Sequence, residues 1–542
     1  MRRLIPILLC AAVLAAQPVT ITILATTDLH GNLLPVDYVT GQPAARGLAK
    51  IATLIRQARA ENANTLLIDC GDTIQGTPLE DVYQSVVRTG VDPAGHGPAA
   101  KLGGDPGGDP GGDPMMRAMN LLGYDAMTLG NHEFNAGLAN LAKARLDARF
   151  PWISANTTVA RGGAEREFAG YIVRTVGGVK VTVIGLTTPV IPIWERPENL
   201  GAYRFREPIE AVRTTVARLR MEERPDLIVV AAHSGLGRNL ETGRSEEPAE
   251  NVVYQLAGQV PDLDAIVFGH SHAQLEGQLV GKVLLVQPKN WGASLARIDF
   301  TLERRPAGRW MVASKRSRLI RVAADTAAAP DLMAMAEPYQ AATERYLNTP
   351  VATSARELDA ARGREEDTAV VDLVQRVQLF YSNADVSFTA LFNPAVRIPQ
   401  GQVTVRQIAA LYPYDNELVA IEGTGKMVKD ALENAARFFS GNGFPGFNYD
   451  MAAGVEYEID RSRPEGERIR NLRWRGKTLA PDQNLRIAIN SYRAGGSGGY
   501  SMFRGAKAVW RSSEGIRELV IRYYTERKSI PGEAMGNWKI VR

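Results

Sequence analysis

Cysteine is almost absent from this sequence: its 542 residues contain only Cys10 and Cys70. If the N-terminal segment is removed from the mature protein, one thiol remains and no internal disulfide can form. Stability in an oxidising compartment must then come from burial of a hydrophobic core. Cys70 lies between an apolar strand pattern and Gly71-Asp72, which favours a buried structural thiol over a nucleophile.

Long apolar runs are also lacking. Residues 4–16 are apolar and follow Met1-Arg2-Arg3, but they fall short of the roughly 20 residues that a membrane span needs. A charged start, a short apolar stretch and small residues at its end are typical of a secretory signal peptide, here residues 1–16. We therefore expect a periplasmic or secreted protein without a transmembrane segment. Cys10 suggests a lipoprotein anchor as a second interpretation, which the bulky Leu9 disfavours.

A strong charge of either sign is missing as well. The formal net charge is +4, which is too weak to indicate a nucleic-acid polymer or a membrane surface as partner. A hydrophobic content of 45% with 23% charged residues is ordinary for a soluble globular enzyme. The length exceeds what one hydrophobic core can organise, so we expect two or three domains. We also expect the protein to be a monomer.

One pattern repeats over the first 300 residues: a β-rich apolar run ends in a short polar, glycine-containing motif, often followed by a helical stretch. Residues 48–58 give such a helix its apolar stripe. Apolar strands separated by helices predict an α/β core covered on both faces, and ligands normally bind at the carboxyl ends of its strands. The apolar runs are 19–25, 65–68, 126–129, 180–185, 227–231 and 265–268.

The sequence predicts the following boundaries. A first domain covers 17–324 and contains an insert, 91–114, in which Gly-Gly-Asp-Pro occurs three times. We interpret this insert as a flexible surface segment, with calcium binding by its aspartates as the alternative. A helix links the domains at 325–349. The remainder, 350–542, mixes strands and helices and predicts an α+β domain, with a helix at 426–439 and strands near 453–459 and 485–490.

Histidine is rare, and its distribution is the most informative feature of the chain. Of six histidines, five fall in the polar motifs that follow the apolar runs, and only His96 lies elsewhere. One Asp-x-His motif would be weak evidence, but five motifs in this order form a specific signal. They are Asp28-Leu29-His30, Gly71-Asp72, Gly130-Asn131-His132-Glu133, His233-Ser234-Gly235 and Gly269-His270-Ser271-His272.

These residue types suit the hydrolysis of a phosphate ester. The negative charge of the ester repels hydroxide, so cations must neutralise the phosphoryl oxygens and generate hydroxide at neutral pH. Two metal ions about 3.5–4 Å apart do both and clamp the in-line displacement. Imidazole and carboxylate ligands favour Mn, Fe, Co or Zn over Ca or Mg.

The order and content of the motifs resemble the calcineurin-like metallophosphoesterases, and more narrowly the bacterial 5′-nucleotidase and 2′,3′-cyclic-nucleotide 2′-phosphodiesterase/3′-nucleotidase family. The resemblance covers nearly the whole mature chain. It implies a four-layer α/β/β/α sandwich followed by a C-terminal α+β nucleotide-recognition domain, and two divalent metal ions with a bridging hydroxide that attacks phosphorus. The implied ligands are Asp28, His30 and His272 for one metal, Asn131, His233 and His270 for the other, and Asp72 as the bridge.

The same resemblance places His132 near the phosphate as a catalytic residue that stabilises developing charge and protonates the leaving oxygen. Typical 5′-nucleotidases of the family orient this histidine with an aspartate three residues later, where this chain has Asn135. An amide oxygen still accepts the imidazole N–H but stabilises imidazolium less. Asn135 favours the cyclic-phosphodiesterase branch. Glu133 is expected to have a structural role.

Recognition of the nucleoside is expected in the second domain. Aromatic faces bind bases by stacking, which contributes about 1–3 kcal/mol per base. By the resemblance, Tyr414 and Tyr492 would clamp the base, while Asn393 and Arg397 would contact ribose and phosphate. The segment around Asn393 is one residue shorter than the family's glycine-rich version, and Ser497 replaces an aspartate, so one contact to the sugar or base is expected to be missing.

The leading hypothesis is therefore hydrolysis of 2′,3′-cyclic nucleotides to 3′-nucleotides and then to nucleosides. A 5′-nucleotidase or UDP-sugar hydrolase is the alternative. A sulfonate hydrolase acting on a partner protein is disfavoured by the two tyrosines. An inactive exported nucleotide-binding module is disfavoured because all seven expected ligands are present.

Overall fold

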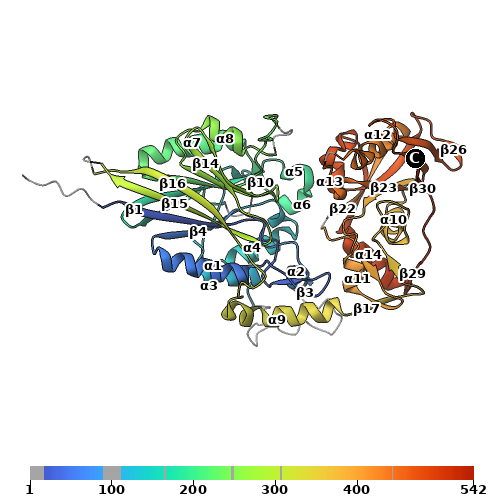
Figure 1. Ribbon diagram of the computed structural model, residues 1–542, viewed down its shortest axis with the longest axis horizontal. Coiled ribbons are helices and arrows are strands. Elements are labelled where there is room, and N and C mark those ends of the chain that lie inside the picture. The colour runs from blue at the N-terminus through green and yellow to red at the C-terminus, as the bar shows by residue number, and fades with distance from the viewer. Residues whose placement is uncertain are drawn as a thin grey trace, which may run out of the picture.

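The computed structural model describes residues 17–89, 111–163, 167–245, 250–305, 308–414, 416–441 and 443–541. The predicted signal peptide and most of the Gly-Gly-Asp-Pro insert lie outside these residues. Figure 1 shows an N-terminal lobe (β1 to β16) and a C-terminal lobe (β17 to β30) joined by helix α9 (Pro330–Leu347). Among the described residues, no helix has the length and apolarity to cross a membrane.

Two six-stranded sheets form the centre of the N-terminal lobe, in the orders β16-β15-β1-β4-β5-β6 and β13-β14-β12-β11-β9-β8. The first contains β1 (Val19–Thr26), β4 (Thr65–Asp69), β5 (Ala126–Thr128), β6 (Trp152–Ile153), β15 (Ser294–Arg304) and β16 (Trp310–Arg321). The second contains β8 (Tyr171–Val176), β9 (Val179–Thr187), β11 (Leu227–His233), β12 (Ala265–Phe268), β13 (Leu275–Val280) and β14 (Val283–Gln287). All six predicted apolar runs are strands, which confirms that part of the sequence interpretation.

Within each sheet, the strands that carry the polar motifs run parallel to one another. β1 pairs with β4 and β4 with β5 in the first sheet, and β9, β11, β12 and β14 are parallel in the second. Parallel neighbours end at the same edge of a sheet, so the motifs that follow them emerge together. This topology brings together residues that lie far apart in the sequence.

Alternating side chains divide the lobe into layers. Ile23 of β1 packs in the core between the two sheets, whereas its neighbour Leu24 packs on the helix-covered face. That face is covered by α1 (Leu48–Glu61), α3 (Pro114–Leu122), α4 (Gly137–Asp147) and α9. Helices α7 (Pro208–Glu222) and α8 (Val253–Gln259) cover the second sheet. The result is the α/β/β/α sandwich, as the sequence predicts.

The C-terminal lobe is built on a five-stranded mixed sheet in the order β23-β19-β27-β22-β28. Its strands are β19 (Val386–Ala390), β22 (Glu417–Thr424), β23 (Asp450–Ala453), β27 (Asn484–Asn490) and β28 (Ala508–Gly515), and its main helices are α10 (Ala369–Ser382), α12 (Gly425–Ala436) and α14 (Ile516–Arg527). The predicted helix at 426–439 corresponds to α12 with the short turn η2 (Arg437–Ser440) that follows it. A second sheet contains β24 (Glu456–Asp460), β25 (Ile469–Trp474), β26 (Lys477–Thr478) and β30 (Trp538–Val541).

Shorter elements complete both lobes. In the N-terminal lobe they are β2 (Val36–Asp37), β3 (Gln42–Pro43), β7 (Thr157–Val159), β10 (Tyr203–Phe205), α2 (Pro78–Thr89), η1 (His132–Phe134), α5 (Ile191–Trp194) and α6 (Pro197–Leu200). In the C-terminal lobe they are β17 (Pro350–Ser354), β18 (Leu358–Asp359), β20 (Arg397–Ile398), β21 (Gly401–Thr404), β29 (Ser529–Ile530), α11 (Val405–Ala409), η3 (Gly446–Asn448), α13 (Ser491–Ala494), η4 (Ser497–Gly499) and η5 (Ser501–Phe503).

The lobes meet along α5 and α6 on one side and α13 and β22 on the other (Figure 1). Arg196, between α5 and α6, forms an ion pair with Glu417 at the start of β22. Farther along the boundary, the Arg517 guanidinium lies 2.8 Å from the Asp81 carboxylate. Charged contacts therefore hold the C-terminal lobe against the edge from which the polar motifs emerge.

Candidate metal centre and nucleoside site

The polar motifs of the N-terminal lobe converge into one ligand cluster. In each of two groups, the ligand atoms lie within 4.8 Å of one another: Asp28, His30 and His272 form the first group, and Asp72, His233 and His270 the second. Asn131 joins the second group, because its Oδ1 lies 3.1 Å from His233 Nε2. Each group is able to hold one cation.

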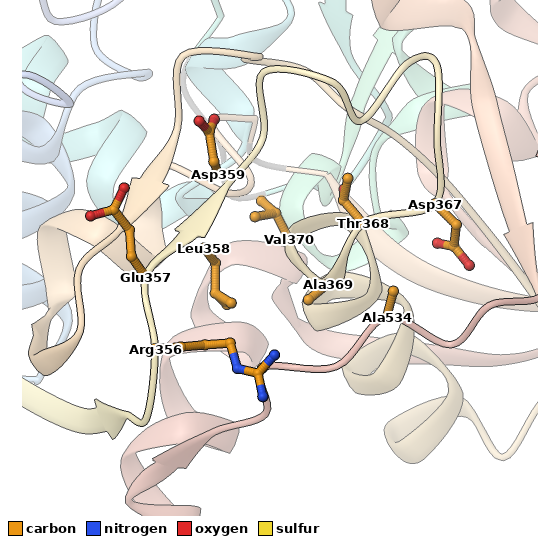
Figure 2. Close-up of a pocket in the computed structure, with 10 residues that line it drawn as sticks. Arg356, Glu357, Leu358, Asp359, Asp367, Thr368, Ala369, Val370 and Ala534 are labelled. Atoms are coloured by element: carbon orange, nitrogen blue, oxygen red, sulfur yellow. The ribbon is translucent and has the colours of Figure 1, made fainter.

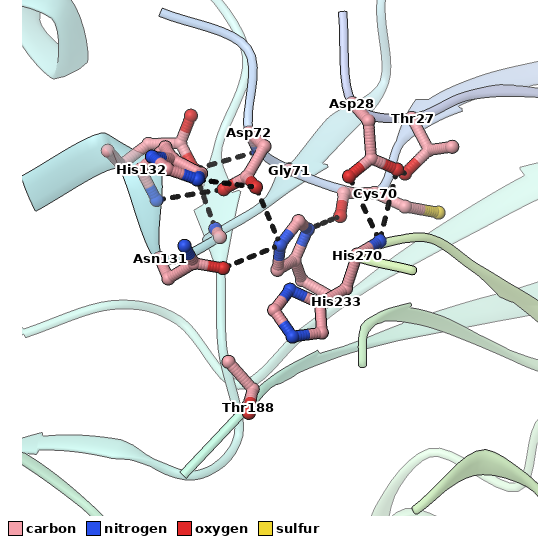
Figure 3. A network of polar contacts seen from close by, with 12 residues as sticks. Thr27, Asp28, Cys70, Gly71, Asp72, Asn131, His132, Thr188, His233 and His270 are labelled. Atoms are coloured by element: carbon pink, nitrogen blue, oxygen red, sulfur yellow. Dashed lines mark hydrogen bonds and ion pairs between the residues drawn. The ribbon is translucent and has the colours of Figure 1, made fainter. Parts of the chain in front are cut away.

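Asp72 belongs to the second group and also reaches towards the first; Figure 3 shows its contact with His233. Its Oδ2 lies 3.0 Å from His233 Nε2 in the second group and 3.8 Å from His30 Nε2 in the first. Its Oδ1 accepts a hydrogen bond from the backbone N–H of His132 at 2.8 Å. One carboxylate thus reaches both groups, which is the arrangement that a bridging ligand requires.

The imidazole rings are oriented by groups outside the cluster. His30 Nδ1 lies 3.0 Å from the Gln75 carbonyl oxygen, and His233 Nδ1 lies 2.8 Å from the Cys70 carbonyl oxygen. A ring that donates from Nδ1 has its lone pair on Nε2. His30 therefore presents the lone pair of its Nε2 to the first group, where His272 Nε2 lies 2.9 Å away. Two imidazole nitrogens and the Asp28 carboxylate converge here, and this donor set fits a divalent metal ion.

His270 has the reverse orientation. Its Nε2 lies 2.8 Å from Oε1 of Glu250, so Nδ1 is the ring atom left for the second group. Carboxylates that hold metal-bound histidines in this way fix the tautomer and raise the basicity of the ligand. The stacked Trp194 ring, with its centroid 5.6 Å from that of His270, supports the same imidazole.

Backbone strain is concentrated at the cluster. Non-glycine residues rarely adopt positive φ, and when several do so at one place the strain usually serves function. Here five candidate ligands share this conformation: Asp28 (φ 48°), His30 (47°), Asp72 (57°), His270 (72°) and His272 (52°). Gly130 is required for a different reason, since a Cβ there would collide with the Asp72 carboxylate.

Glu133 belongs to neither ligand group, but it binds the backbone of the loops that carry the ligands. It is fully buried, and its carboxylate accepts hydrogen bonds from the backbone N–H groups of Thr73, Gly130 and Asp72 at 2.6, 2.7 and 2.9 Å. These bonds tie the loop after β4 to the loop after β5. The structural role expected for Glu133 agrees with this arrangement.

The pKa values of two histidines in the cluster are shifted far from the ordinary value of an imidazole. Burial and the neighbouring His272 lower the pKa of His30 to about 3. Burial also acts to lower the pKa of His233, but the Asp72 carboxylate outweighs it and raises that pKa to about 10. Such opposed shifts arise where carboxylates and imidazoles are packed densely away from water. A pair of divalent cations is the natural complement of that arrangement.

His132 lies beside the cluster rather than in either group. Its Nε2 is 3.9 Å from Asp72 Oδ2, and a third of its side chain, 33%, remains exposed. Its Nδ1 lies 2.5 Å from Oδ1 of Asn135, so the amide acceptor that the sequence predicts is in place. The Asn135 amide nitrogen in turn donates to Oε2 of Glu195 at 2.6 Å.

Tyr414 and Tyr492 belong to the C-terminal lobe, and Tyr492 lies close enough to Glu250, the partner of His270, for the two side chains to interact electrostatically. They are 44% and 38% exposed. Burial raises the pKa of Tyr492, and the neighbouring Glu250 and Tyr414 act in the same direction although Arg493 opposes them. Gly495, just after α13, packs against Trp194: a Cβ there would lie 3.3 Å from the indole Cδ1. Tyr492 is therefore exposed beside a residue that contacts the ligand cluster, and Tyr414 is exposed close to Tyr492.

With this geometry in place, known proteins supply the decisive comparison. Residues 21–274 match the family model of calcineurin-like phosphoesterases, and residues 343–505 match that of the 5′-nucleotidase C-terminal domain. A 2′,3′-cyclic-nucleotide 2′-phosphodiesterase/3′-nucleotidase of Salmonella typhimurium is 30% identical over 98% of this chain and 90% of its own length. The chain belongs to this family of metallophosphoesterases.

Other relatives agree. The trifunctional nucleotide phosphoesterase protein YfkN of Bacillus subtilis is 28% identical over 97% of this chain, which spans only 39% of that longer protein. A Staphylococcus aureus protein solved in complex with α-ketoglutarate superposes with a TM-score of 0.80 at 25% identity, covering 97% of this chain and 100% of that one. This metallophosphoesterase is accordingly a metal-dependent enzyme of the nucleotidase type.

Arg397 and Asn393, the two residues predicted to contact ribose and phosphate, each bond to a nearby group of the protein. Arg397, on β20, forms an ion pair with Asp359 of the neighbouring β18. Asn393 accepts a hydrogen bond from the backbone N–H of Ala395 at 2.9 Å, which closes its own turn. Their contacts with ribose and phosphate stay predictions. A cavity of about 220 Å³ in the C-terminal lobe, beside Arg356, Leu358 and Asp367, contains none of the predicted site residues (Figure 2).

The sequence interpretation missed the residues that hold the site from outside. Glu250 contacts His270, and Glu195 contacts Asn135, the partner of His132. The buried Arg493 fixes helix α13, which carries Tyr492, to Asp450, with Nε–Oδ2 and Nη2–Oδ1 distances of 2.8 and 2.9 Å. None belongs to a recognisable motif. The only available signal was that Glu195 and Glu250 follow β9 and β11, at the same edge as the predicted ligands.

Proposed function

We propose that this metallophosphoesterase is a 2′,3′-cyclic-nucleotide 2′-phosphodiesterase/3′-nucleotidase. The supporting observation combines two exposed tyrosines with a cluster of two cation-binding groups, both reached by Asp72. Tyr492 interacts electrostatically with Glu250, which contacts His270 of that cluster. A nucleotide has two parts, and the two features match them: the phosphate carries charge for the cations, and the base offers a face for Tyr414 and Tyr492.

In this proposal Asp28, His30 and His272 hold one divalent ion, Asn131, His233 and His270 hold the other, and Asp72 joins them. When bound, the ions neutralise the phosphoryl oxygens and supply hydroxide at neutral pH; Mn, Zn, Co and Fe all suit these ligands. The protein contributes orientation through the fixed imidazoles and keeps the ligands in a strained, preorganised backbone.

The reaction proceeds in two hydrolyses. Water adds to the cyclic phosphodiester, the bond between phosphorus and O2′ breaks, and the 2′-hydroxyl takes up a proton to give the 3′-nucleotide. A second water then breaks the bond between phosphorus and O3′, giving the nucleoside and phosphate. His132 is placed to donate the proton to each leaving oxygen, because its Nε2 faces the cluster while Nδ1 stays on Asn135.

Two observations favour the cyclic-nucleotide substrate over a 5′-nucleotide or UDP-sugar. Asn135 occupies the place of the family's aspartate, and the candidate base clamp consists of tyrosines. The match to the 5′-nucleotidase C-terminal domain over 343–505 is the reason to keep the alternative. We further propose that the protein is exported after removal of residues 1–16 and functions as a monomer, which N-terminal sequencing and light scattering would check.

A substrate panel tests the function. The full-length enzyme, loaded in turn with Mn, Zn or Co, would be given 2′,3′-cyclic AMP, 3′-AMP, 5′-AMP and a UDP-sugar, with products separated by chromatography. We expect conversion of the cyclic substrate through 3′-AMP to adenosine, with kcat/KM at least about tenfold above that for 5′-AMP, a difference of about 1.4 kcal/mol. Preference for 5′-AMP or the UDP-sugar would overturn the proposal in favour of the alternative.

A further inference from the structure

A chain of hydrogen bonds extends from His132 away from the ligand cluster. His132 Nδ1 lies 2.5 Å from Oδ1 of Asn135, and Asn135 Nδ2 donates to Oε2 of Glu195 at 2.6 Å. Glu195 is 60 residues from Asn135 in the sequence and reaches it from the turn that ends α5. Position 135 lacks the aspartate that would contact the histidine directly in typical 5′-nucleotidases of the family. The Glu195 carboxylate is instead linked to His132 through the Asn135 amide.

The carboxylate decides which way the amide faces. An asparagine side chain offers an acceptor oxygen and a donor nitrogen, whereas an ionised carboxylate only accepts. Glu195 must therefore receive the Asn135 nitrogen, which turns the amide oxygen towards His132. That oxygen accepts only from a ring nitrogen that carries hydrogen. The arrangement consequently specifies hydrogen on Nδ1 of His132 and directs Nε2 towards the cluster.

Glu195 is itself held firmly. Its Oε1 accepts from the backbone N–H of Arg196 at 2.8 Å and from Nδ2 of Asn199 at 2.9 Å. Its own backbone N–H donates to the Ile191 carbonyl oxygen at 2.9 Å and closes α5. These contacts leave Oε2 for Asn135, so the geometry at Asn135 follows from a side chain that has little freedom to move.

We propose that Glu195 is a positioning residue for His132. It orients the Asn135 amide and places a negative charge behind the imidazole, a task that a carboxylate at position 135 would perform directly. The inference rests on the proposed role of His132 as the proton donor. In that step the Nε2 proton moves to the leaving oxygen as the P–O bond breaks, the electrons of that bond remain on the oxygen, and Nδ1–H stays on Asn135.

The nature of the leaving group distinguishes positioning from a purely structural role. A nitrophenolate is stable as an anion and leaves without a proton, whereas a nucleoside alkoxide needs one. Misorientation of His132 therefore slows hydrolysis of 3′-AMP much more than hydrolysis of p-nitrophenyl phosphate. Loosening of the α5–α6 turn, which also contacts Glu417 through Arg196, would slow both esters equally.

The experiment uses the full-length, metal-loaded enzyme and four variants. For Glu195→Gln we expect kcat for 3′-AMP to fall about tenfold or more, which is part of the 10²–10⁴-fold that acid catalysis contributes as a whole. KM for 3′-AMP and the rate of hydrolysis of p-nitrophenyl phosphate should change by no more than about twofold. Asn135→Asp in the Glu195→Gln background restores a carboxylate on Nδ1 and should recover most of the lost rate. Glu198→Gln, an exposed neighbour on α6, is the matched control and should behave as the parent enzyme.

His132→Ala tests the role of His132 as proton donor separately from the role of Glu195. If it slows both esters equally, the proposed role of His132 as proton donor fails. If it is selective for 3′-AMP and Glu195→Gln is not, the role of Glu195 alone is overturned. An equal loss for both esters in Glu195→Gln, accompanied by a lower melting temperature or lost metal by mass spectrometry, would make Glu195 structural and would also overturn the proposal.

Discussion

The Glu250 carboxylate lies 2.8 Å from Nε2 of His270 and thereby leaves Nδ1 of that ring for the group formed with Asp72 and His233. The backbone of Glu250 is fixed as well, because its carbonyl oxygen accepts from the Ser234 hydroxyl at 2.7 Å. One residue outside the ligand set thus determines which nitrogen of His270 is available to a cation.

Weakening this contact should weaken one metal site. Because outer-shell carboxylates typically contribute 10–100-fold to metal affinity, we expect Glu250→Gln to lower the affinity of one of two ions by about tenfold. Competition with a chelator, followed by metal analysis, would measure it. Glu241→Gln, on the exposed part of the same loop, serves as the control. Loss of both ions together, or of neither, would contradict the assignment of Glu250 to a single site.

Replacing the shared carboxylate should have a larger effect. Asp72 reaches imidazoles of both groups, with Oδ2 3.0 Å from His233 Nε2 and 3.8 Å from His30 Nε2. Asp72→Asn removes the charge that holds two cations close together, so we expect both ions to bind weakly and turnover to fall by about a thousandfold, or about 4 kcal/mol. Retention of two tightly bound ions per chain would show that Asp72 does not bridge them.

The tyrosines are expected to act on binding rather than on the chemical step. Since each stacked ring contributes about 1–3 kcal/mol, Tyr414→Ala together with Tyr492→Ala should raise KM for the preferred nucleotide about tenfold or more. The same double variant should hydrolyse p-nitrophenyl phosphate, which carries no nucleoside, at the rate of the parent enzyme. Equal losses for both substrates would mean that the rings stabilise the contact between the lobes.

The parts of the molecule differ in how far the sequence predicts them. The apolar runs specify the strands because buried parallel strands need continuous hydrophobic sequence, and their polar ends fall together wherever such strands are parallel. His30 and Asp72 could therefore be assigned to one centre before the fold was known. Glu195 and Glu250 could not, because they reach Asn135 and His270 through loops whose course depends on tertiary packing. A lone glutamate in a loop carries no local signal of its partner.

The protein partner of Arg397 is a further contact that the sequence does not predict. The resemblance predicts that Arg397 contacts ribose and phosphate, and this stays a prediction. In the structure Arg397 pairs with Asp359 across the β18–β20 ladder. A short antiparallel pairing aligns these two residues directly, so an ion pair forms between neighbours. Spacing in the sequence does not reveal this partner, since Asp359 lies well before the motif that contains Arg397.

Stability is expected to depend on pH through Asp372, far from the ligand cluster in α10. Burial raises the pKa of this carboxyl from 3.8 to about 7, against the hydrogen bond that it accepts from the backbone N–H of Met535 at 2.5 Å. Between these two values the native state keeps a proton that the unfolded chain has lost, so the free energy of unfolding falls as pH rises from about 4 to about 7 and levels off above that.

Asp372→Asn keeps the acceptor for Met535 but cannot ionise. The melting temperature of this variant, measured beside the parent protein at a series of pH values, should therefore decline less across that window, and the two curves should run parallel above about pH 8. Parallel curves throughout would mean that Asp372 titrates alike in both states, and that its burial does not hold the proton.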